Sequence, residues 1–265
     1  EQLIWRLKVL VGKDFLAKSC IDTRPIPERF SALQAGLGFI GRHTNLIHPR
    51  FGPYIFLSEI LTDLDLKADR PVSGDCASCE DCLHVCPTQA LSRKDPMDAR
   101  RCIAYLTIEH AGVIEREFRR KIGDRIFGCD ACLAICPFAA KSVQTAWKEF
   151  YPSQGTGEWL DIHGIFELQS DSEFKKRFKG SPISRLGLKR LKRNACLVLA
   201  NSGDTNAIPY LEKALHDPSP LVRIHAAWGL GQFQSDRSRQ ILIQRLSQEK
   251  DPRVRDEISV SISSS

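Results

Sequence analysis

The sequence predicts an α+β protein with a mixed N-terminal part, a cysteine-rich part and a helical C-terminal part. Three observations support this prediction. Short apolar runs alternate with turns over residues 1–70, cysteines gather in two runs within residues 71–145, and an apolar pattern of helical spacing recurs over residues 184–265. Residues 146–183, which are punctuated by prolines and glycines, read as a connecting segment.

The N-terminal part predicts short elements. Residues 3–11 suit a helix or a strand, residues 28–35 a helix and residues 54–57 a strand. Residues 36–41 match G-x-G-x-x-G, but that pattern indicates dinucleotide binding only directly after a strand. Because a predicted helix precedes it, we reject nicotinamide-dinucleotide binding. We expect the glycines to permit a turn or the close approach of another ligand.

The first cysteine run is the most specific feature of the chain. The spacing Cys76-x-x-Cys79-x-x-Cys82-x-x-x-Cys86-Pro87 is the one by which bacterial ferredoxins hold [4Fe–4S] clusters. Three closely spaced thiolates fit three corners of one cubane. The fourth, which precedes a proline, ligates a different cluster, so a partner motif is expected downstream.

The partner motif is Cys129-x-x-Cys132-x-x-x-Cys136, again followed by proline. In the ferredoxin register its first cysteine is replaced by Ile126, and Cys102 can supply the missing thiolate. The number of ligands then reaches eight, which is the requirement of two cubanes. We assign one cluster to Cys76, Cys79, Cys82 and Cys136, and the other to Cys86, Cys102, Cys129 and Cys132.

Other uses of the cysteines agree less well with the sequence. Zinc sites use paired C-x2-C knuckles, and disulfide frameworks suit small secreted chains. This chain has 265 residues, 42% of them hydrophobic, and shows no secretory segment at its start. The remaining two cysteines, Cys20 and Cys196, are expected to be apolar packing residues.

The C-terminal part contains a weak internal repeat. Residues 192–199 recur in outline as residues 223–230, and Asp217-Pro218 recurs as Asp251-Pro252. The period of about 31 residues is typical of paired-helix repeats of the HEAT kind. Each pair is expected to bury its apolar stripe against the next pair.

Charge is concentrated where this repeat begins. The net charge is +6, and nine basic residues but no acidic residue lie between Phe174 and Gly203. A solvated helix face would explain such a run, but its imbalance favours contact with a phosphate backbone. The candidate phosphate contacts are Lys189, Arg190, Lys192 and Arg193.

The thiols and the hydropathy of the chain indicate the cellular compartment in which we expect the protein. No run of about 18 apolar residues occurs, so no membrane association is expected. Reduced cysteines and oxygen-sensitive clusters favour the cytoplasm. The chain begins at Glu1 rather than at Met, and we expect that it lacks an N-terminal portion of the natural protein.

Taken together, these residues resemble the epoxyqueuosine reductase family. Residues 22–29 are similar to its D-[ST]-x-P-[VI]-x-E-R segment, and residues 36–44 to its G-L-G-[WF]-I-G-K-N-T segment. Residues 101–109 are similar to its R-C-I-[SA]-Y-L-T-I-E segment, which contains the lone Cys102. Residues 128–130 match its G-C-D. The resemblance covers nearly the whole chain.

The resemblance implies a function. Epoxyqueuosine at the tRNA wobble position would be reduced to queuosine, with electrons passing from a donor protein or reductant through two [4Fe–4S] clusters to cobalamin. The family implies that Asp22 protonates the opening epoxide. It also implies a monomer in which the C-terminal repeats bind tRNA. The cofactor-binding residues implied by the resemblance are Asp22, Gly41, Arg42, Tyr105 and Asp130.

The same resemblance gives each part an identity. Residues 1–70 would be the C-terminal part of a cobalamin-binding catalytic domain, residues 71–145 a ferredoxin-like two-cluster domain and residues 184–265 HEAT-like repeats. One departure is that Arg42-His43 replaces the usual Lys-Asn. A cobalamin-dependent reductive dehalogenase and a two-cluster ferredoxin are the alternatives. Neither explains the residue 22–29 segment together with the repeats.

Overall fold

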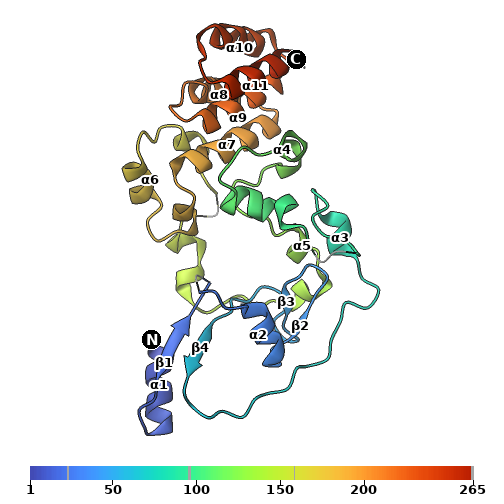
Figure 1. The fold of residues 1–265 in the computed structure, drawn as a ribbon, viewed down its shortest axis with the longest axis vertical. Coiled ribbons are helices and arrows are strands. Elements are labelled where there is room, and N and C mark those ends of the chain that lie inside the picture. The colour runs from blue at the N-terminus through green and yellow to red at the C-terminus, as the bar shows by residue number, and fades with distance from the viewer. Residues whose placement is uncertain (23, 95–96, 158, 264–265) are drawn as a thin grey trace. The chain divides into compact units, whose positions relative to one another are not determined.

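A computed structural model describes residues 1–22, 24–94, 97–157 and 159–263 (Figure 1). The chain divides into two compact units. The first unit comprises Glu1–Met97 and Asp130–Gln144, and the second comprises Asp98–Cys129 and Thr145–Ser265. The segment predicted as one cysteine-rich domain, residues 71–145, contributes residues to both units.

The first unit contains two small antiparallel sheets. Strand β1 pairs with β4, with Cys20 opposite Glu59, and β2 pairs with β3. The predicted strand at residues 54–57 is wrong, because the partner of β1 lies a few residues later. The strands are β1 (Ala17–Cys20), β2 (Phe39–Ile40), β3 (Leu46–Ile47) and β4 (Glu59–Thr62).

Four short helices complete the first unit. Residues 3–11, which suit a helix or a strand, form a helix that ends at Gly12, whose φ of 69° is the left-handed conformation that glycine adopts at helix ends. The helix predicted before the glycine-rich run is also present, which confirms the structural ground for rejecting a dinucleotide site. The helices are α1 (Gln2–Val11), α2 (Glu28–Gln34), α3 (Asp81–Val85) and α5 (Ala131–Ala134).

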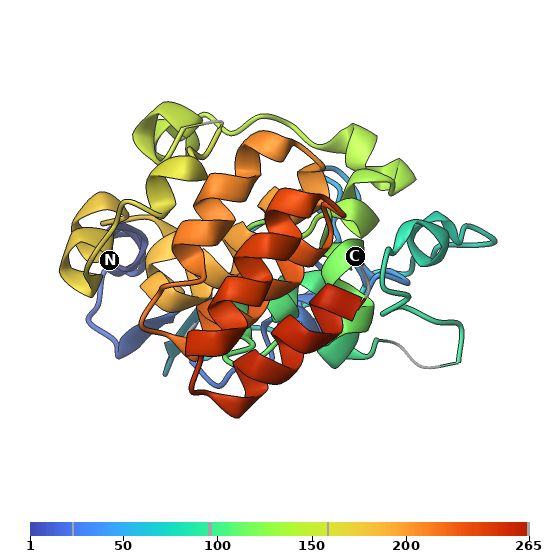
Figure 2. The same ribbon diagram turned by 90° about the horizontal axis from the view of Figure 1, so that it is seen from above.

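The second unit is dominated by stacked helices. Helix α9 packs against α7 on one side and α11 on the other, and Figures 1 and 2 show these helices side by side. Their packed faces form one apolar core that includes Leu191, Cys196, Val222, Val254 and Ile258. The helices are α4 (Arg116–Ile122), α6 (Asp171–Arg177), α7 (Leu188–Ser202), α8 (Ile208–Ala214), α9 (Pro220–Gly231), α10 (Asp236–Gln248) and α11 (Pro252–Ser263).

The predicted repeat is visible in these helices. Helices α9 and α11 begin at Pro220 and Pro252, each shortly after the aspartate of an Asp-Pro pair, and the third residue of each helix, Val222 or Val254, is fully buried. Proline suits the first turn of a helix because its missing N–H would have no partner there. Among the described residues, none of the helices has the length and apolar character of a membrane span.

The sequence of residues 98–120 favours a helix that is broken near Gly112, but the structure is less regular. The segment forms a 3-10 turn at Ala99–Arg101, a π-helical turn at Tyr105–Glu109 and α4. π-helical turns are rare and are often found at functional sites. Side chains of α7, namely Arg193 and Asn194, donate hydrogen bonds to main-chain carbonyls of this irregular segment.

Candidate functional site

Four cysteines of the first unit surround one cavity. We call it the four-cysteine cavity, and it is lined by Cys76, Cys79, Cys82, Cys136, His43, Pro137 and Phe138. These four thiols are the set that the sequence assigned to one cluster. All ten cysteines are free thiols, and Cys20 and Cys196 are buried as expected of packing residues.

Local structure places these thiols. The main-chain N–H of Cys79 donates to the carbonyl of Cys76 at 2.9 Å, which closes a tight turn between the first two cysteines. Cys82 lies on α3, and α3 packs against α5, the helix that precedes Cys136. Phe39 meets Phe138 edge to face at 5.4 Å between ring centres. The cavity is therefore held by packing on several sides.

Two effects oppose ionisation of the thiols in the cavity. Burial raises the pKa of the Cys82 thiol above its ordinary value, and the nearby thiols of Cys76, Cys79 and Cys136 raise it further. Iron offsets both effects, because a coordinated thiol is deprotonated outright. Among the described residues, no group of three or more Cys, His, Asp or Glu side chains is spaced to hold a single metal ion. Four thiols around one cavity equal the number of protein ligands that one cubane requires.

His43 is an additional polar side chain in the four-cysteine cavity. It is 2% exposed, and burial lowers its pKa below the ordinary histidine value. Its Nδ1 accepts a hydrogen bond from the Asn45 main-chain N–H at 3.2 Å, whereas its Nε2 is buried without a hydrogen-bond partner. The sequence analysis did not identify His43 as a site residue. The one signal in the sequence was that a histidine stands where the family usually has an asparagine.

The second predicted ligand set is divided between the two units. Cys86 and Cys132 belong to the first unit, and Cys102 and Cys129 to the second. The Cys86 Sγ accepts a hydrogen bond from the Ala90 main-chain N–H at 3.2 Å. This set therefore remains a prediction from the number and spacing of the cysteines.

Within the second unit, the segments that contain Cys102 and Cys129 are tied together. The buried Thr107 hydroxyl donates to the Ile103 carbonyl at 2.7 Å and accepts from the Gly128 N–H at 3.0 Å. Asn194 of α7 donates to the carbonyls of Thr107 and Ile126. Ile126, which occupies the position of the missing cysteine, packs against the apolar core of the repeats.

Asp22 lies on the exposed connection between β1 and α2, and its neighbour Thr23 is outside the described residues. Its φ of 51° is a left-handed conformation that costs a non-glycine residue energy and is common at functional sites. The main-chain N–H of Asp22 donates to the Glu28 carboxylate at 2.7 Å. Among the described residues, none buries the Asp22 side chain, whereas a general acid is expected to be buried.

A second carboxylate lies on the strand that pairs with β1. Glu59 is on β4, and burial together with the charge of Glu28 raises its pKa above the ordinary value. The start of α2 also lines a pocket of about 500 Å³. Sequence reasoning did not identify Glu59, and only its pairing with the strand that leads to Asp22 reveals it.

The other predicted cofactor-binding residues fall into two groups. A Cβ on Gly41 would meet the Ile47 side chain at 2.7 Å, so glycine is needed there for internal packing. Arg42 is engaged with the cysteine loop, since its main-chain N–H lies 3.4 Å from the Cys76 Sγ and its guanidinium donates to Ala77. Tyr105 and Asp130 are exposed, so they remain accessible to a bound group.

The phosphate-contact prediction fails for Arg193. Its guanidinium is 0% exposed and donates to the carbonyls of Leu106, His110 and Gly112 and to the Asn194 side chain. These four bonds use four of the five N–H donors of the guanidinium within the second unit. The arginine supports the irregular segment and is inaccessible to RNA.

The neighbouring basic residues differ in accessibility. Lys192 is 8% exposed, and its ammonium lies 3.0 Å from the Asp217 carboxylate. Arg190 is partly buried and donates to the carbonyls of Leu186 and Ile108. Only Lys189 of the four is exposed. The basic run therefore supports the fold more than the sequence suggested.

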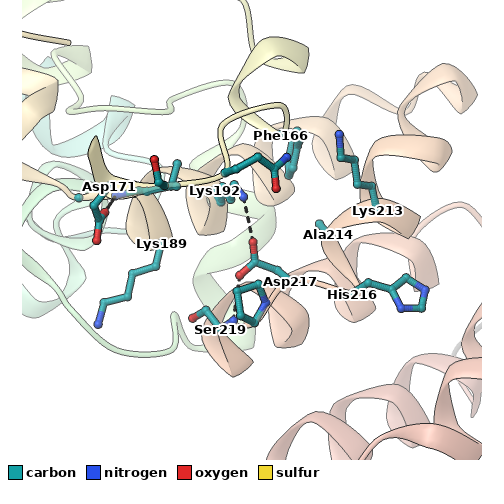
Figure 3. Close-up of a pocket in the computed structure, with 14 residues that line it drawn as sticks. Phe166, Asp171, Lys189, Lys192, Lys213, Ala214, His216, Asp217 and Ser219 are labelled. Carbon is teal, nitrogen blue, oxygen red and sulfur yellow. Dashed lines mark hydrogen bonds and ion pairs between the residues drawn. The ribbon is translucent and has the colours of Figure 1, made fainter. Parts of the chain in front are cut away.

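Lys189 stands beside a pocket of about 560 Å³ between α6, α7 and the turn before α9 (Figure 3). Lys213 and His216 also line it and are exposed, and the Lys192–Asp217 ion pair lies within it. Lys213 is 2.8 Å from Glu167, so part of its charge is compensated. This hollow places two exposed lysines beside the predicted phosphate contacts.

Comparison with known proteins gives two matches to families. Residues 75–139 match 4Fe-4S double cluster binding domains, and residues 187–263 match HEAT repeats. Both matches lie within the parts for which the sequence predicted them.

Relatives match over most of the chain. An epoxyqueuosine reductase from Xanthomonas campestris pv. campestris is 42% identical over 235 residues, which are 88% of this chain and 65% of that protein. The chain therefore spans about two thirds of the length of such relatives.

Solved structures match the fold as well. A crystal structure of epoxyqueuosine reductase with an epoxyqueuosine-modified tRNA-Tyr stem loop is 34% identical, with a TM-score of 0.89, and covers 99% of this chain and 70% of that one. The enzyme from Bacillus subtilis, solved with an aspartate-bearing catalytic loop swung out of the active site, is 32% identical with a TM-score of 0.88, and covers 99% of this chain and 70% of that one. By this similarity in sequence and fold, the chain belongs to the epoxyqueuosine reductase family.

Proposed function

We propose that this chain is the cluster-binding and tRNA-binding part of an enzyme that reduces epoxyqueuosine to queuosine at the wobble position of tRNA. The observation that most supports this is the four-cysteine cavity, in a chain that also contains HEAT repeats. A cluster site joined to an RNA-binding platform suits a redox reaction on a nucleotide.

The reaction needs two electrons and two protons. Loss of the epoxide oxygen breaks two C–O bonds, forms one C=C bond and releases water. Single electrons are supplied by the two proposed clusters. Cobalamin, when bound, would supply the low-valent metal that acts on the epoxide carbons. The residues of this chain would bind the clusters, contact the cofactor through Tyr105 and Asp130, and deliver a proton.

Asp22 is the proposed proton donor. An opening epoxide leaves an alkoxide, which takes up a proton from a nearby acid. The strained, exposed connection that holds Asp22 suits a loop that closes over a substrate, and Glu28 fixes its main chain. The Bacillus subtilis enzyme with its aspartate-bearing loop swung out of the active site supports this reading. The raised pKa of Glu59 makes it a candidate to return the proton.

The tRNA surface is proposed to lie over the basic pocket of Figure 3. Lys189 and Lys213 are its accessible cations, with His216 beside them. A relative bound to an epoxyqueuosine-modified stem loop supports RNA as the ligand. We also propose that the protein works as a monomer in the cytoplasm, where its thiols stay reduced, and takes electrons from a donor protein or reductant.

An assay on the full-length protein tests this proposal. Wild type should convert epoxyqueuosine tRNA to queuosine tRNA under anaerobic, reducing conditions with cobalamin. Asp22→Asn should lower turnover by a factor of about 10² to 10⁴ while the clusters and tRNA affinity persist. Asp124→Asn, which changes another exposed aspartate, should retain full turnover. Turnover by Asp22→Asn within twofold of wild type would remove Asp22 from the role.

A further inference from the structure

The four-cysteine cavity contains a hydrogen-bond donor that its four proposed ligands do not require. A cubane accepts four protein ligands, and the cavity supplies four thiols. His43 lines the same cavity with its Nε2 buried and without a partner. Leaving a buried polar group unpaired costs about 1–3 kcal/mol, so such a group calls for an explanation.

The hydrogen bonds of the ring identify which nitrogen carries the proton. The Nδ1 accepts from the Asn45 main-chain N–H at 3.2 Å, so it cannot itself hold a proton. A histidine ring always has at least one N–H, which must therefore be at Nε2. The unpaired atom is a donor.

Gly41 lies against the His43 ring, and Arg42 contacts one of the cysteines. A Cβ at Gly41 would lie 3.0 Å from Cε1 and 3.2 Å from Nε2 of His43, so glycine at that position gives the ring its room. The main-chain N–H of the next residue, Arg42, already donates to the Cys76 Sγ at 3.4 Å. One short segment thus supplies a main-chain donor to the Cys76 sulfur and, at the next residue, an unpaired side-chain donor in the lining of the same cavity.

We propose that the Nε2–H of His43 donates a hydrogen bond to a sulfur of the cluster held by Cys76, Cys79, Cys82 and Cys136, and so raises the reduction potential of that cluster. This inference rests on the proposed ligand set. The reduced cluster carries one more negative charge than the oxidised one, so a donor stabilises it more. Hydrogen bonds to the sulfurs are among the features that set cluster potentials.

Magnetic resonance on the wild-type protein tests the contact without a variant. The full-length protein, reconstituted anaerobically with iron and sulfide, should show a histidine nitrogen and an exchangeable proton weakly coupled to the reduced cluster after ¹⁵N-histidine labelling and transfer to D2O. A strongly coupled, directly bound nitrogen would overturn the proposal, as would the absence of any histidine coupling.

Variants test the consequence. His43→Leu should retain its iron and make reduction less favourable by up to about tenfold, which corresponds to about 59 mV for one electron. His43→Gln keeps a side-chain N–H and should recover much of the wild-type potential. The matched control is His84→Leu, because His84 is exposed on α3 within the cysteine loop and does not line the cavity.

The outcomes separate this inference from the ligand assignment. Equal potentials in wild type and His43→Leu, with iron intact, would overturn the role of His43 alone. Retention of both cubanes by Cys76→Ala would overturn the ligand set and the inference with it. An equal shift in His84→Leu would also refute the inference, since the effect would then not depend on the cavity.

Discussion

Replacement of Arg193 distinguishes a structural arginine from an RNA contact. Its guanidinium has four oxygen acceptors in the second unit, three of them main-chain carbonyls between Leu106 and Gly112. Burial lowers its pKa to about 10, which still leaves the side chain charged at neutral pH. Arg193→Met removes every donor but keeps much of the volume.

The expected loss follows from these acceptors. Each buried carbonyl left unpaired costs about 1–3 kcal/mol, and removing one partner from a buried charged network typically costs about 3–5 kcal/mol in total. Desolvation of the guanidinium already offsets part of the gain in wild type, so we expect a loss of about 3–5 kcal/mol in the free energy of unfolding. Arg193→Lys should lose about half as much, because an ammonium cannot span all four acceptors.

Urea denaturation measures this loss. Circular dichroism follows the helices, and fluorescence follows Trp228, which is 3% exposed whereas Trp5, Trp147 and Trp159 are largely exposed. The control is Lys189→Met on the same helix, where an exposed charge should contribute less than about 0.5 kcal/mol. A loss below about 1 kcal/mol for Arg193→Met would refute the structural role. Weakened tRNA binding without destabilisation would restore the phosphate-contact prediction.

Three further predictions follow from the ligands, the charges and the basic pocket. Cys102→Ala should remove one of two cubanes, whereas Cys20→Ala and Cys196→Ala should keep about eight iron atoms per chain. Iron analysis and electron paramagnetic resonance measure both outcomes. Two intact cubanes in Cys102→Ala would contradict the assignment. Burial raises the pKa of Glu249, but hydrogen bonds from Arg223, Asp251 and Arg245 outweigh burial and hold it at about 2. Because this pKa lies below that of the unfolded chain, the stabilisation is present above about pH 4.5 and is lost as pH falls towards 2. Glu249→Gln should therefore be less stable than wild type at pH 7, and its free energy of unfolding should fall less steeply over that pH interval. An acid denaturation profile equal to that of wild type would refute the network. Lys189→Ala with Lys213→Ala should weaken tRNA binding and flatten the log–log salt slope by roughly 0.7 to 0.9 per lost contact; slopes equal to wild type in a fluorescence titration would place the RNA elsewhere.

Cysteine spacing was the most predictive part of the sequence because its geometry is local. A tight turn between Cys76 and Cys79 and a short helix at Cys82 bring three thiols together through contacts within one short segment. Cys136 is distant in sequence, yet the proline after it and the spacing before it repeat the same pattern. The motif therefore predicted that these four cysteines lie together, although it did not identify His43 beside them.

Strand pairing could not be predicted in the same way. Residues 54–57 have strand-like composition, but β1 pairs with Glu59–Thr62 instead. A strand requires a partner, and register depends on which face is buried rather than on composition. The irregular form of residues 98–122 was missed for a related reason. Their carbonyls are satisfied by side chains far along the sequence, such as Asn194 and Arg193.

The basic run shows how burial reverses the meaning of a charge. Lysines and arginines on a helix normally indicate a solvated face, and an unbalanced run favours phosphate. Residues 191–200 of α7 are buried on every side, so the charges there must be satisfied within the protein. Composition alone does not distinguish an exposed arginine from one that donates to main-chain carbonyls.

The contacts of α7 give the repeats a second role besides substrate binding. Asn194 and Arg193 hold the segment between Cys102 and Cys129, and the buried His225 of α9 accepts from the Ile114 N–H at 3.1 Å within it. Two proposed cluster ligands are therefore positioned by the helices that are also proposed to bind tRNA. Any strain that RNA imposes on α7 would reach these two thiols through hydrogen bonds and not through a flexible linker. For the same reason, the segment between Cys102 and Cys129 and the repeats should unfold as one cooperative unit.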